Sequence, residues 1–268
     1  MSRLSASSTD AVPDSDVAIR LRGVVKAYAN GVAALGPLDL DLRRGEFVSL
    51  LGPSGCGKST ALRIIAGLSE ASEGEVRLAG GGTARRRIGF VFQEPTLMPW
   101  ASVRDNVRLP LTLARIARPT ADRQVAAALA GVELSEFADA YPRQLSGGMR
   151  MRVSLARALV TDPDVLLMDE PFAALDEITR FKLNNDLLHL WEKFGWTVIF
   201  VTHSVFESVY LSSRIVVMAS RPGRVIDELA IDAPYPREEE FRTSSIYNEY
   251  CRKTSDALHA AMEGSEHR

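Results

Sequence analysis

The chain has 268 residues, 46% hydrophobic and 25% charged, which suits one large globular domain or a domain with a subdomain. Its formal net charge of −2 gives no bulk electrostatic case for nucleic-acid binding. Its two cysteines lack metal-site spacing, which indicates a reducing compartment, and no apolar run approaches the roughly 20 residues of a membrane-spanning helix.

The first half of the chain begins with a polar segment and continues with strands. We expect residues 1–16 to form a flexible leader, because they are rich in Ser, Ala and Asp and lack the apolar core of a signal peptide. Residues 17–25 and 38–42 alternate apolar and polar side chains, as half-buried strands do. Residues 47–51 are apolar apart from Ser49, which predicts a strand covered on both faces of a parallel sheet.

A glycine-rich turn follows that strand and fits the phosphate-binding pattern Gly-x-x-x-x-Gly-Lys-Ser. Its glycines allow close backbone approach, and the open N–H groups of a following helix can wrap a triphosphate. Lys58 is placed to neutralise the β- and γ-phosphates, Ser59 offers a hydroxyl to Mg²⁺, and Thr60 can bond on the α-phosphate side. The alternative is a strand-to-helix turn without a ligand. The loop residues expected to contact nucleotide are Gly52, Pro53, Ser54, Gly55, Cys56, Gly57, Lys58, Ser59 and Thr60.

Further along, predicted strands alternate with predicted helices, which indicates an α/β fold with a largely parallel sheet. A proline-punctuated, mostly helical region from about 94 to 159 interrupts the alternation and predicts an inserted α subdomain. The remaining expected strands are 75–78, 88–92, 164–168, 196–202, 214–220 and 225–231. The expected helical segments are the one after Lys58, 122–129, 135–138, 149–159, 178–194, 205–211 and 243–262, and an exposed loop is expected at 80–87.

An acidic pair, Asp169 and Glu170, follows the apolar run 165–168. Ligands of open α/β sheets bind at the carboxyl ends of strands, where this pair emerges. An aspartate there can hold Mg²⁺ through its water shell, and the glutamate can polarise an attacking water as a general base. Such a pair can also be purely structural, but the upstream phosphate loop favours the functional interpretation.

A third signal is the sequence Leu-Ser-Gly-Gly-Met at 145–149. Ser146 can cap the helix that begins here, while Gly147 and Gly148 leave backbone N–H groups open toward an anion. On the local pattern alone, an ordinary capped helix start after Pro142 is the stronger interpretation.

Taken in order, these motifs resemble those of the ATP-binding subunit of an ABC transporter, over residues 17–231. Gly52 to Thr60 resembles the Walker A loop, and Asp169 with Glu170 resembles Walker B. Gln93 matches the Q-loop, and His203 matches the H-loop. The segment 145–149 matches the signature, and the segment 174–176 matches the D-loop.

The resemblance implies roles for single residues. Tyr28 would stack on adenine, although a core tyrosine is its alternative, and Gln93 would touch Mg²⁺ and the attacking water. Ser146, Gly147 and Gly148 would contact the γ-phosphate held by a second subunit, Asp176 would line that interface, and His203 would contact the γ-phosphate and hold Glu170. The implied catalytic set is Lys58, Gln93, Glu170 and His203, and the implied metal set is Ser59, Gln93 and Asp169.

The expected fold is therefore an α/β P-loop NTPase with a mostly parallel central sheet, an antiparallel β subdomain near the N-terminus and an inserted α-helical subdomain. The expected divisions are a leader at 1–16, an ATPase domain at 17–233 with its helical insert at 94–159, and a helical extension at 234–268. Two departures from the pattern are Met149, where Gln is commonest, and Ser204, where Asp usually follows the histidine.

Local features resemble the importer ATPases for nitrate, sulfonate and taurine, namely 92–95, 97–100, 169–176 and 221–224, while 202–211 resembles relatives serving pyrimidine precursors. This implies ATP and Mg²⁺ as cofactors, a homodimer, an integral membrane permease and a separate solute-binding protein, at the cytoplasmic face of the inner membrane. Exposed Leu97, Met98 and Trp100 would meet the permease, or else pack within the subdomain.

Three other protein classes remain as alternatives. A soluble non-transport ABC ATPase predicts long coiled-coil insertions, tandem cassettes or a basic face, none of which the sequence shows. A P-loop kinase would not need residues 145–149 or His203, and a non-catalytic regulatory module would not need Glu170.

Overall fold

The computed structural model describes residues 16–78, 87–220 and 222–266. The leader expected at 1–16 and the exposed loop expected at 80–87 therefore lie almost wholly outside the described residues. Within the part that is described, no helix is both long and apolar enough to cross a membrane.

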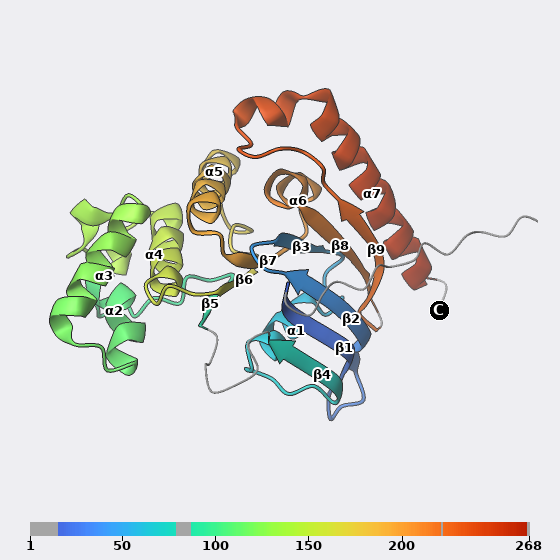
Figure 1. The fold of residues 1–268 in the computed structure, drawn as a ribbon, viewed down its shortest axis with the longest axis horizontal. Helices are drawn as coiled ribbons and strands as arrows, with labels where there is room; N and C mark the ends of the chain where they lie inside the picture. Colours follow the sequence, from blue (N-terminus) through green and yellow to red (C-terminus); the bar gives the residue numbers. More distant parts are fainter. Residues whose placement is uncertain (1–15, 79–86, 221, 267–268) are drawn as a thin grey trace, which may run out of the picture.

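A six-stranded sheet with the order β5-β6-β7-β3-β8-β9 forms the centre of the molecule (Figure 1). Neighbouring strands from β5 to β8 pair in parallel, and β9 pairs antiparallel with β8. Every residue of β3, β6 and β7 is buried, as their largely apolar sequences predict. The strands are β3 (Phe47–Leu51), β5 (Ile88–Val91), β6 (Val165–Asp169), β7 (Thr197–Thr202), β8 (Arg214–Ala219) and β9 (Arg224–Ala230).

A second, antiparallel sheet has the order β2-β1-β4 and lies below the central sheet in Figure 1. It consists of β1 (Val17–Ala27), β2 (Ala33–Arg43) and β4 (Glu73–Leu78). Together with α1 (Lys58–Ile65) it covers one face of the central sheet, since these elements share one apolar core with that face. The predicted antiparallel β subdomain is confirmed.

The inserted region forms a helical subdomain at the side of the sheet (Figure 1). It holds α2 (Val103–Leu113), α3 (Arg118–Gly131), α4 (Gly147–Leu159) and the short 3-10 turns η1 (Ser135–Phe137) and η2 (Pro142–Gln144). The prediction of a helix at 135–138 is wrong, because that segment makes only a 3-10 turn. By contrast, α2 continues through Pro110, since Val103, Val107 and Leu111 bury one apolar stripe that holds the helix in place.

The central sheet separates two apolar cores. Alternation along β3 sends Phe47 and Leu51 into one core and Val48 and Leu50 into the other. The core of Phe47 is closed by the helical subdomain and by α5 (Glu177–Phe194), α6 (Val205–Leu211) and α7 (Ser245–Glu266). This double covering leaves the strand ends and their loops as the exposed sites for chemistry.

The C-terminal segment packs on the core through η3 (Glu239–Thr243) and α7, which lies against β8 and α6 (Figure 1). The buried Arg237 side chain holds the start of this segment in place. Its guanidinium stacks on Tyr235 with 4.1 Å to the ring centre. It donates hydrogen bonds to the backbone carbonyls of Val209, Tyr210, Ser212, Ile231 and Ala233. The boundary expected at 233 remains a prediction.

Candidate active site

The phosphate loop connects β3 to α1 in a conformation that requires glycine at two positions. A Cβ at Gly52 would lie 2.5 Å from the carbonyl oxygen of Met218, a distance that side chains do not tolerate. Gly57 has a φ of +88°, and a Cβ there would lie 2.5 Å from the carbonyl oxygen of Ala34. The loop is therefore wedged between β8 and the start of β2, which fixes its curvature.

The N-terminus of α1 is open to an anion. Among the described residues no side chain caps this helix, and its first turn holds no acidic residue, so its first N–H groups are available. The buried Lys58 ammonium donates to the carbonyl oxygens of Gly52 at 2.7 Å and Pro53 at 3.0 Å. A positive charge is thus held inside the loop by weak neutral acceptors, which a triphosphate can replace.

Ser59 and Asp169 meet at the edge of the sheet. The Ser59 hydroxyl donates a 2.7 Å hydrogen bond to Asp169 Oδ1. Burial raises the pKa of the Asp169 carboxyl, and the bond from Ser59 and the charges of Arg63 and Lys58 oppose that rise. A hydroxyl and a buried carboxylate at this distance are hard oxygen donors, so the pair fits a Mg²⁺ ion.

Glu170 and His203 lie side by side because β6 and β7 are neighbours, with Asp169 opposite Val201 in register. His203 Nδ1 is 3.3 Å from Glu170 Oε2. The Glu170 side chain is 21% exposed and that of His203 is 58% exposed, so solvent water can reach both. Glu170 has a φ of +46°, and its N–H donates to the carbonyl oxygen of Val201 at 3.0 Å. Such a strained backbone angle in a non-glycine residue is common at functional sites.

Gln93 and Tyr28 lie at the margins of this site. Gln93 follows β5, which pairs with β6 so that Val91 faces Met168, and its side chain is exposed at the same edge of the sheet. Tyr28 follows β1 and is 43% exposed, so the alternative that it is a core tyrosine is wrong. Their expected contacts with Mg²⁺ and adenine remain predictions.

The signature residues lie in the helical subdomain, away from α1 (Figure 1). Ser146 caps α4 by accepting a hydrogen bond from the N–H of Met149 at 3.2 Å, and its side chain is exposed. Gly148 is buried against α5, where an added Cβ would lie 2.6 Å from Thr179 Cγ2. The exposed Asp176 caps α5, and the hydrogen bond from the Thr179 N–H lowers its pKa. The chain does not bring these residues to its own phosphate loop.

The departure at Ser204 has a local explanation. Ser204 caps α6, because its hydroxyl accepts a hydrogen bond from the N–H of Glu207 at 3.3 Å. A serine therefore supplies the capping oxygen that an aspartate can supply. Sequence reasoning missed Glu207 itself, a buried acid beside the His203 loop, whose only signal is a charged residue next to the apolar Val209, Tyr210 and Leu211.

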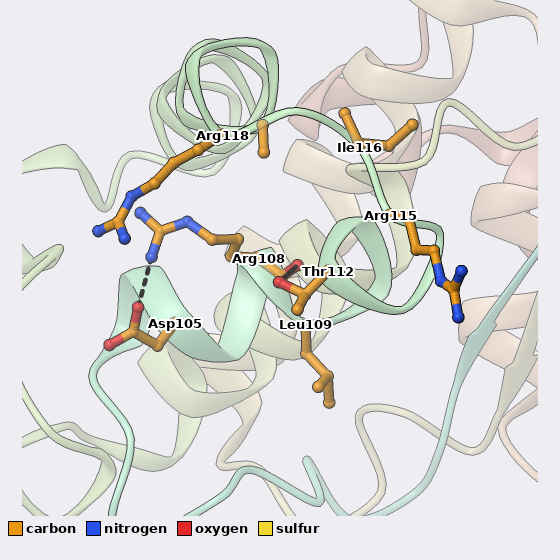
Figure 2. Close-up of a pocket in the computed structure, with 8 residues that line it drawn as sticks. Asp105, Arg108, Leu109, Thr112, Arg115, Ile116 and Arg118 are labelled. Atoms are coloured by element: carbon orange, nitrogen blue, oxygen red, sulfur yellow. Dashed lines mark hydrogen bonds and ion pairs between the residues drawn. The ribbon is translucent and has the colours of Figure 1, made fainter.

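A separate cavity lies elsewhere, on the helical subdomain. Figure 2 shows this groove of about 440 Å³ between α2 and α3. Arg108 contributes to its lining but is paired with Asp105 at 2.6 Å, as Figure 2 marks by a dashed line. It is also paired with Asp122 at 2.7 Å. None of the residues lining it belongs to the phosphate loop or the acidic pair. The groove is therefore separate from the candidate active site.

Residues 35–173 match the ABC transporter family, and the similarity to members of that family extends over most of the chain. The chain belongs to the ABC transporter family. An uncharacterized ABC transporter ATP-binding protein of Methanocaldococcus jannaschii is 47% identical over 249 residues, which are 90% of this chain and 91% of that protein. An aliphatic sulfonates import ATP-binding protein of Pseudomonas savastanoi is 46% identical over 228 residues, covering 85% and 90% of the two chains.

The fold of this ABC ATPase is also that of solved cassettes. A dimeric post-hydrolysis structure of the ATP-binding cassette MJ0796 with ADP and Pi has a TM-score of 0.71 and 35% identity, over 81% of this chain and all of that one. The family, the fold and the ATPase activity predicted from the motifs are therefore confirmed. The roles of the single site residues remain predictions.

Proposed function

We propose that this ABC ATPase is the ATP-hydrolysing subunit of a membrane importer and works as a head-to-tail homodimer. One observation carries the proposal. The phosphate loop, Asp169, Glu170 and His203 converge at one sheet edge, while exposed Ser146 lies on α4 in the helical subdomain. Each chain thus carries two separated halves of a nucleotide site, and a second copy can complete both.

The similarity to dimeric cassettes supports the homodimer. The structure of MJ0796 with ADP and Pi is described as dimeric, and 81% of the present chain aligns with it. Exposed Asp176, at the start of α5, would lie at that dimer interface.

The chain's own groups account for the hydrolysis. Lys58 and the open N–H groups of α1 bind the β- and γ-phosphates and stabilise the charge that develops there. Glu170 orients the attacking water and accepts its proton, and His203 holds the Glu170 carboxylate in place. Mg²⁺, held by Ser59 and Asp169, would neutralise phosphate charge when bound.

The exposed loop before α2 is the proposed contact with the permease. Trp100 is 77% exposed, whereas Met98 is half-buried and Leu97 packs against the core, so the alternative of packing within the subdomain holds for Leu97. The buried Asn106 amide holds this loop by donating to the carbonyl oxygens of Met98, Ala101 and Ser102. Trp100 is thereby presented on a fixed turn to a protein partner.

The transported solute is proposed from relatives and from local sequence. Proteins named for the import of aliphatic sulfonates, from Bacillus cereus and Pseudomonas savastanoi, are among those similar to this chain. A sulfonate, nitrate or taurine is therefore the first substrate class to test, and a pyrimidine precursor the second. A separate solute-binding protein would select it, and the ATPase would sit on the cytoplasmic face of the inner membrane.

Three measurements test the proposal. Glu170→Gln should abolish steady-state ATP hydrolysis while ATP binding persists; unchanged turnover would exclude the base role. Ser146→Arg protein mixed equally with wild type should lower activity further than dilution does. A matched control is Ser102→Arg, which alters another capping serine, on α2. If the activity of the mixture falls only as far as dilution predicts, the shared site is contradicted.

Co-purification from the membrane tests the permease contact. Failure to recover any membrane protein would favour a soluble, non-transport ABC ATPase.

A further inference from the structure

A buried polar cluster lies between α5, α6 and the end of β7, beside the candidate active site. Its members are Thr202, Asn184 and Glu207, all buried, and the half-buried Arg180. Polar groups in such a place normally satisfy one another completely. This cluster does not, and its connections lead to two different loops.

The first connection leads to the loop of His203. The Thr202 hydroxyl donates a 2.6 Å hydrogen bond to Glu207 Oε2 and accepts one from the Ser204 N–H at 3.0 Å. Ser204 in turn accepts from the N–H of Glu207. The residues on both sides of His203 are therefore tied to Glu207, Thr202 through its carboxylate and Ser204 through its backbone N–H.

The second connection leads to the loop of Asp176. Arg180 Nη2 donates a 2.9 Å hydrogen bond to the carbonyl oxygen of Leu175, the residue before Asp176. Arg180 Nε lies 3.9 Å from Glu207 Oε1, close enough for charge attraction but too far for a hydrogen bond. One arginine thus faces both loops.

The cluster is incompletely bonded in this conformation. Glu207 Oε1, Arg180 Nε and both amide atoms of Asn184 are buried without a hydrogen-bond partner among the described residues. Burial raises the pKa of Glu207, which reflects the cost of holding its charge here. A movement of about 1 Å would bring Arg180 and Glu207 within hydrogen-bond distance and satisfy two of these atoms. A shift of that size would therefore give the cluster a better-bonded arrangement than the one seen here.

We infer that Arg180 and Glu207 are a positioning pair that couples the loop of Asp176 to the loop of His203. A partner subunit that displaces the Asp176 loop moves Leu175, then Arg180, and through Glu207 and Thr202 the backbone of His203. The pair sets the geometry of hydrolysis and does not bind ATP. The inference rests on the proposed function, which places Asp176 and His203 at a shared nucleotide site.

A double-mutant cycle on the purified full-length dimer tests the coupling. Arg180→Gln and Glu207→Gln should each lower kcat about tenfold, with KM for ATP changed less than about twofold, because the pair acts on geometry and not on binding. The double variant should be no slower than the slower single variant, because both changes break one connection. Thermal unfolding of each variant is measured alongside.

A matched control is the Arg214–Glu46 pair. It is also an arginine–glutamate pair largely shielded from solvent, with side chains 19% and 13% exposed and 2.7 Å apart. It lies where β3 and β8 begin, at the opposite end of the sheet. Arg214→Gln and Glu46→Gln should lower the unfolding temperature and leave kcat unchanged. If these control changes lower kcat as much as the changes at Arg180 and Glu207 do, the proposed coupling is wrong. It is also wrong if the effects of Arg180→Gln and Glu207→Gln on kcat are additive.

Two further variants separate this inference from general misfolding and from the proposed function. Arg180→Lys keeps the charge and fold but cannot reach Leu175 and Glu207 with two donors, so it should lower kcat as Arg180→Gln does. An unchanged kcat in Arg180→Lys would overturn the proposed coupling. If Glu170→Gln abolishes turnover but the changes at Arg180 and Glu207 do not affect it, only the proposed coupling is wrong. If Glu170→Gln has no effect on turnover, the proposed function itself is wrong.

Discussion

The Ser59 hydroxyl donates a 2.7 Å hydrogen bond to Asp169, joining residues that are 110 positions apart in the chain. One follows β3 and the other ends β6, two strands that β7 separates in the sheet. Parallel pairing places their carboxyl ends at one edge, and the loop after β3 reaches across to meet Asp169. The same two oxygens hold the loop in place and present a site for Mg²⁺.

Asp169→Asn should raise stability while removing activity. The substitution keeps an acceptor for Ser59 but removes a buried charge, so we expect the free energy of unfolding to rise by about 0.5–2 kcal/mol. ATP hydrolysis should fall by about a hundredfold or more, because charge stabilisation at the phosphates is lost. Urea unfolding and a phosphate-release assay measure the two effects. A destabilised, active variant would contradict the prediction.

The stability gain of Asp169→Asn should depend on pH. Because burial raises the pKa of this carboxyl, the folded protein binds the proton more tightly than the unfolded chain, whose value is near 3.8. Wild-type stability is therefore lost as pH rises through the raised pKa, and the gap between variant and wild type is largest above it. Below 3.8 the gap should close. Unfolding curves from pH 3 upward test this.

Asp41→Asn is a control whose effect on the free energy of unfolding should have the opposite sign to that of Asp169→Asn. Burial opposes ionisation of Asp41, but hydrogen bonds and charges from Arg22 and Arg20 outweigh it and lower the pKa. Its contribution to stability is present above the unfolded pKa and is lost as pH falls through the folded one. Asp41→Asn should therefore lower stability most near neutral pH. The same sign for both variants would exclude this account.

Gly148→Ala should destabilise the fold, whereas Gly147→Ala should not. A Cβ at Gly148 would lie 2.6 Å from Thr179 Cγ2, and one at Gly147 an ordinary 3.4 Å from Leu175 Cδ2. We expect Gly148→Ala to cost about 1–3 kcal/mol of unfolding free energy. Adding Thr179→Ser, which removes the clashing methyl, should restore most of it. If the two alanine variants lost the same unfolding free energy, the close contact between α4 and α5 at Gly148 would not limit stability.

Trp100→Ala should leave the isolated subunit unchanged and weaken its hold on the permease. Because Trp100 is 77% exposed, we expect its removal to change the free energy of unfolding by less than about 0.5 kcal/mol. Leu97→Ala is the companion variant, and it should lower stability because Leu97 packs against the core. Co-purification with the membrane complex measures the first effect. Undiminished recovery of Trp100→Ala would remove this residue from the contact.

Arg237→Lys should destabilise the protein although it preserves charge. One ammonium cannot replace a guanidinium that bonds five carbonyl oxygens and stacks on Tyr235. We expect a loss of about 2–4 kcal/mol in chemical denaturation. Arg252→Lys, on the exposed side of α7, is the matched control and should have little effect. A small effect at both positions would mean that water satisfies these carbonyls.

Elements with a strong local signal could be predicted from the sequence. The strand 47–51 has the same bounds in the structure, because four of its five residues are apolar and lie on both faces, which requires cover on both sides. The segment 135–138 was misassigned, because so short an apolar pattern cannot distinguish a helix from a 3-10 turn. The sequence leaves the exposure of Leu97 open, and the structure selects packing within the subdomain, because burial of a loop residue depends on what packs over it.

The sequence by itself determined the phosphate loop, the acidic pair and the family, because each motif is contiguous and its chemistry is carried by neighbouring residues. Only the tertiary structure decided which distant residues meet. It brought Ser59 to Asp169 and set Arg180 between the loops of Asp176 and His203. It also placed α4, which Ser146 caps, away from α1, which begins at Lys58 (Figure 1). These juxtapositions depend on strand order and helix packing, which no local pattern encodes.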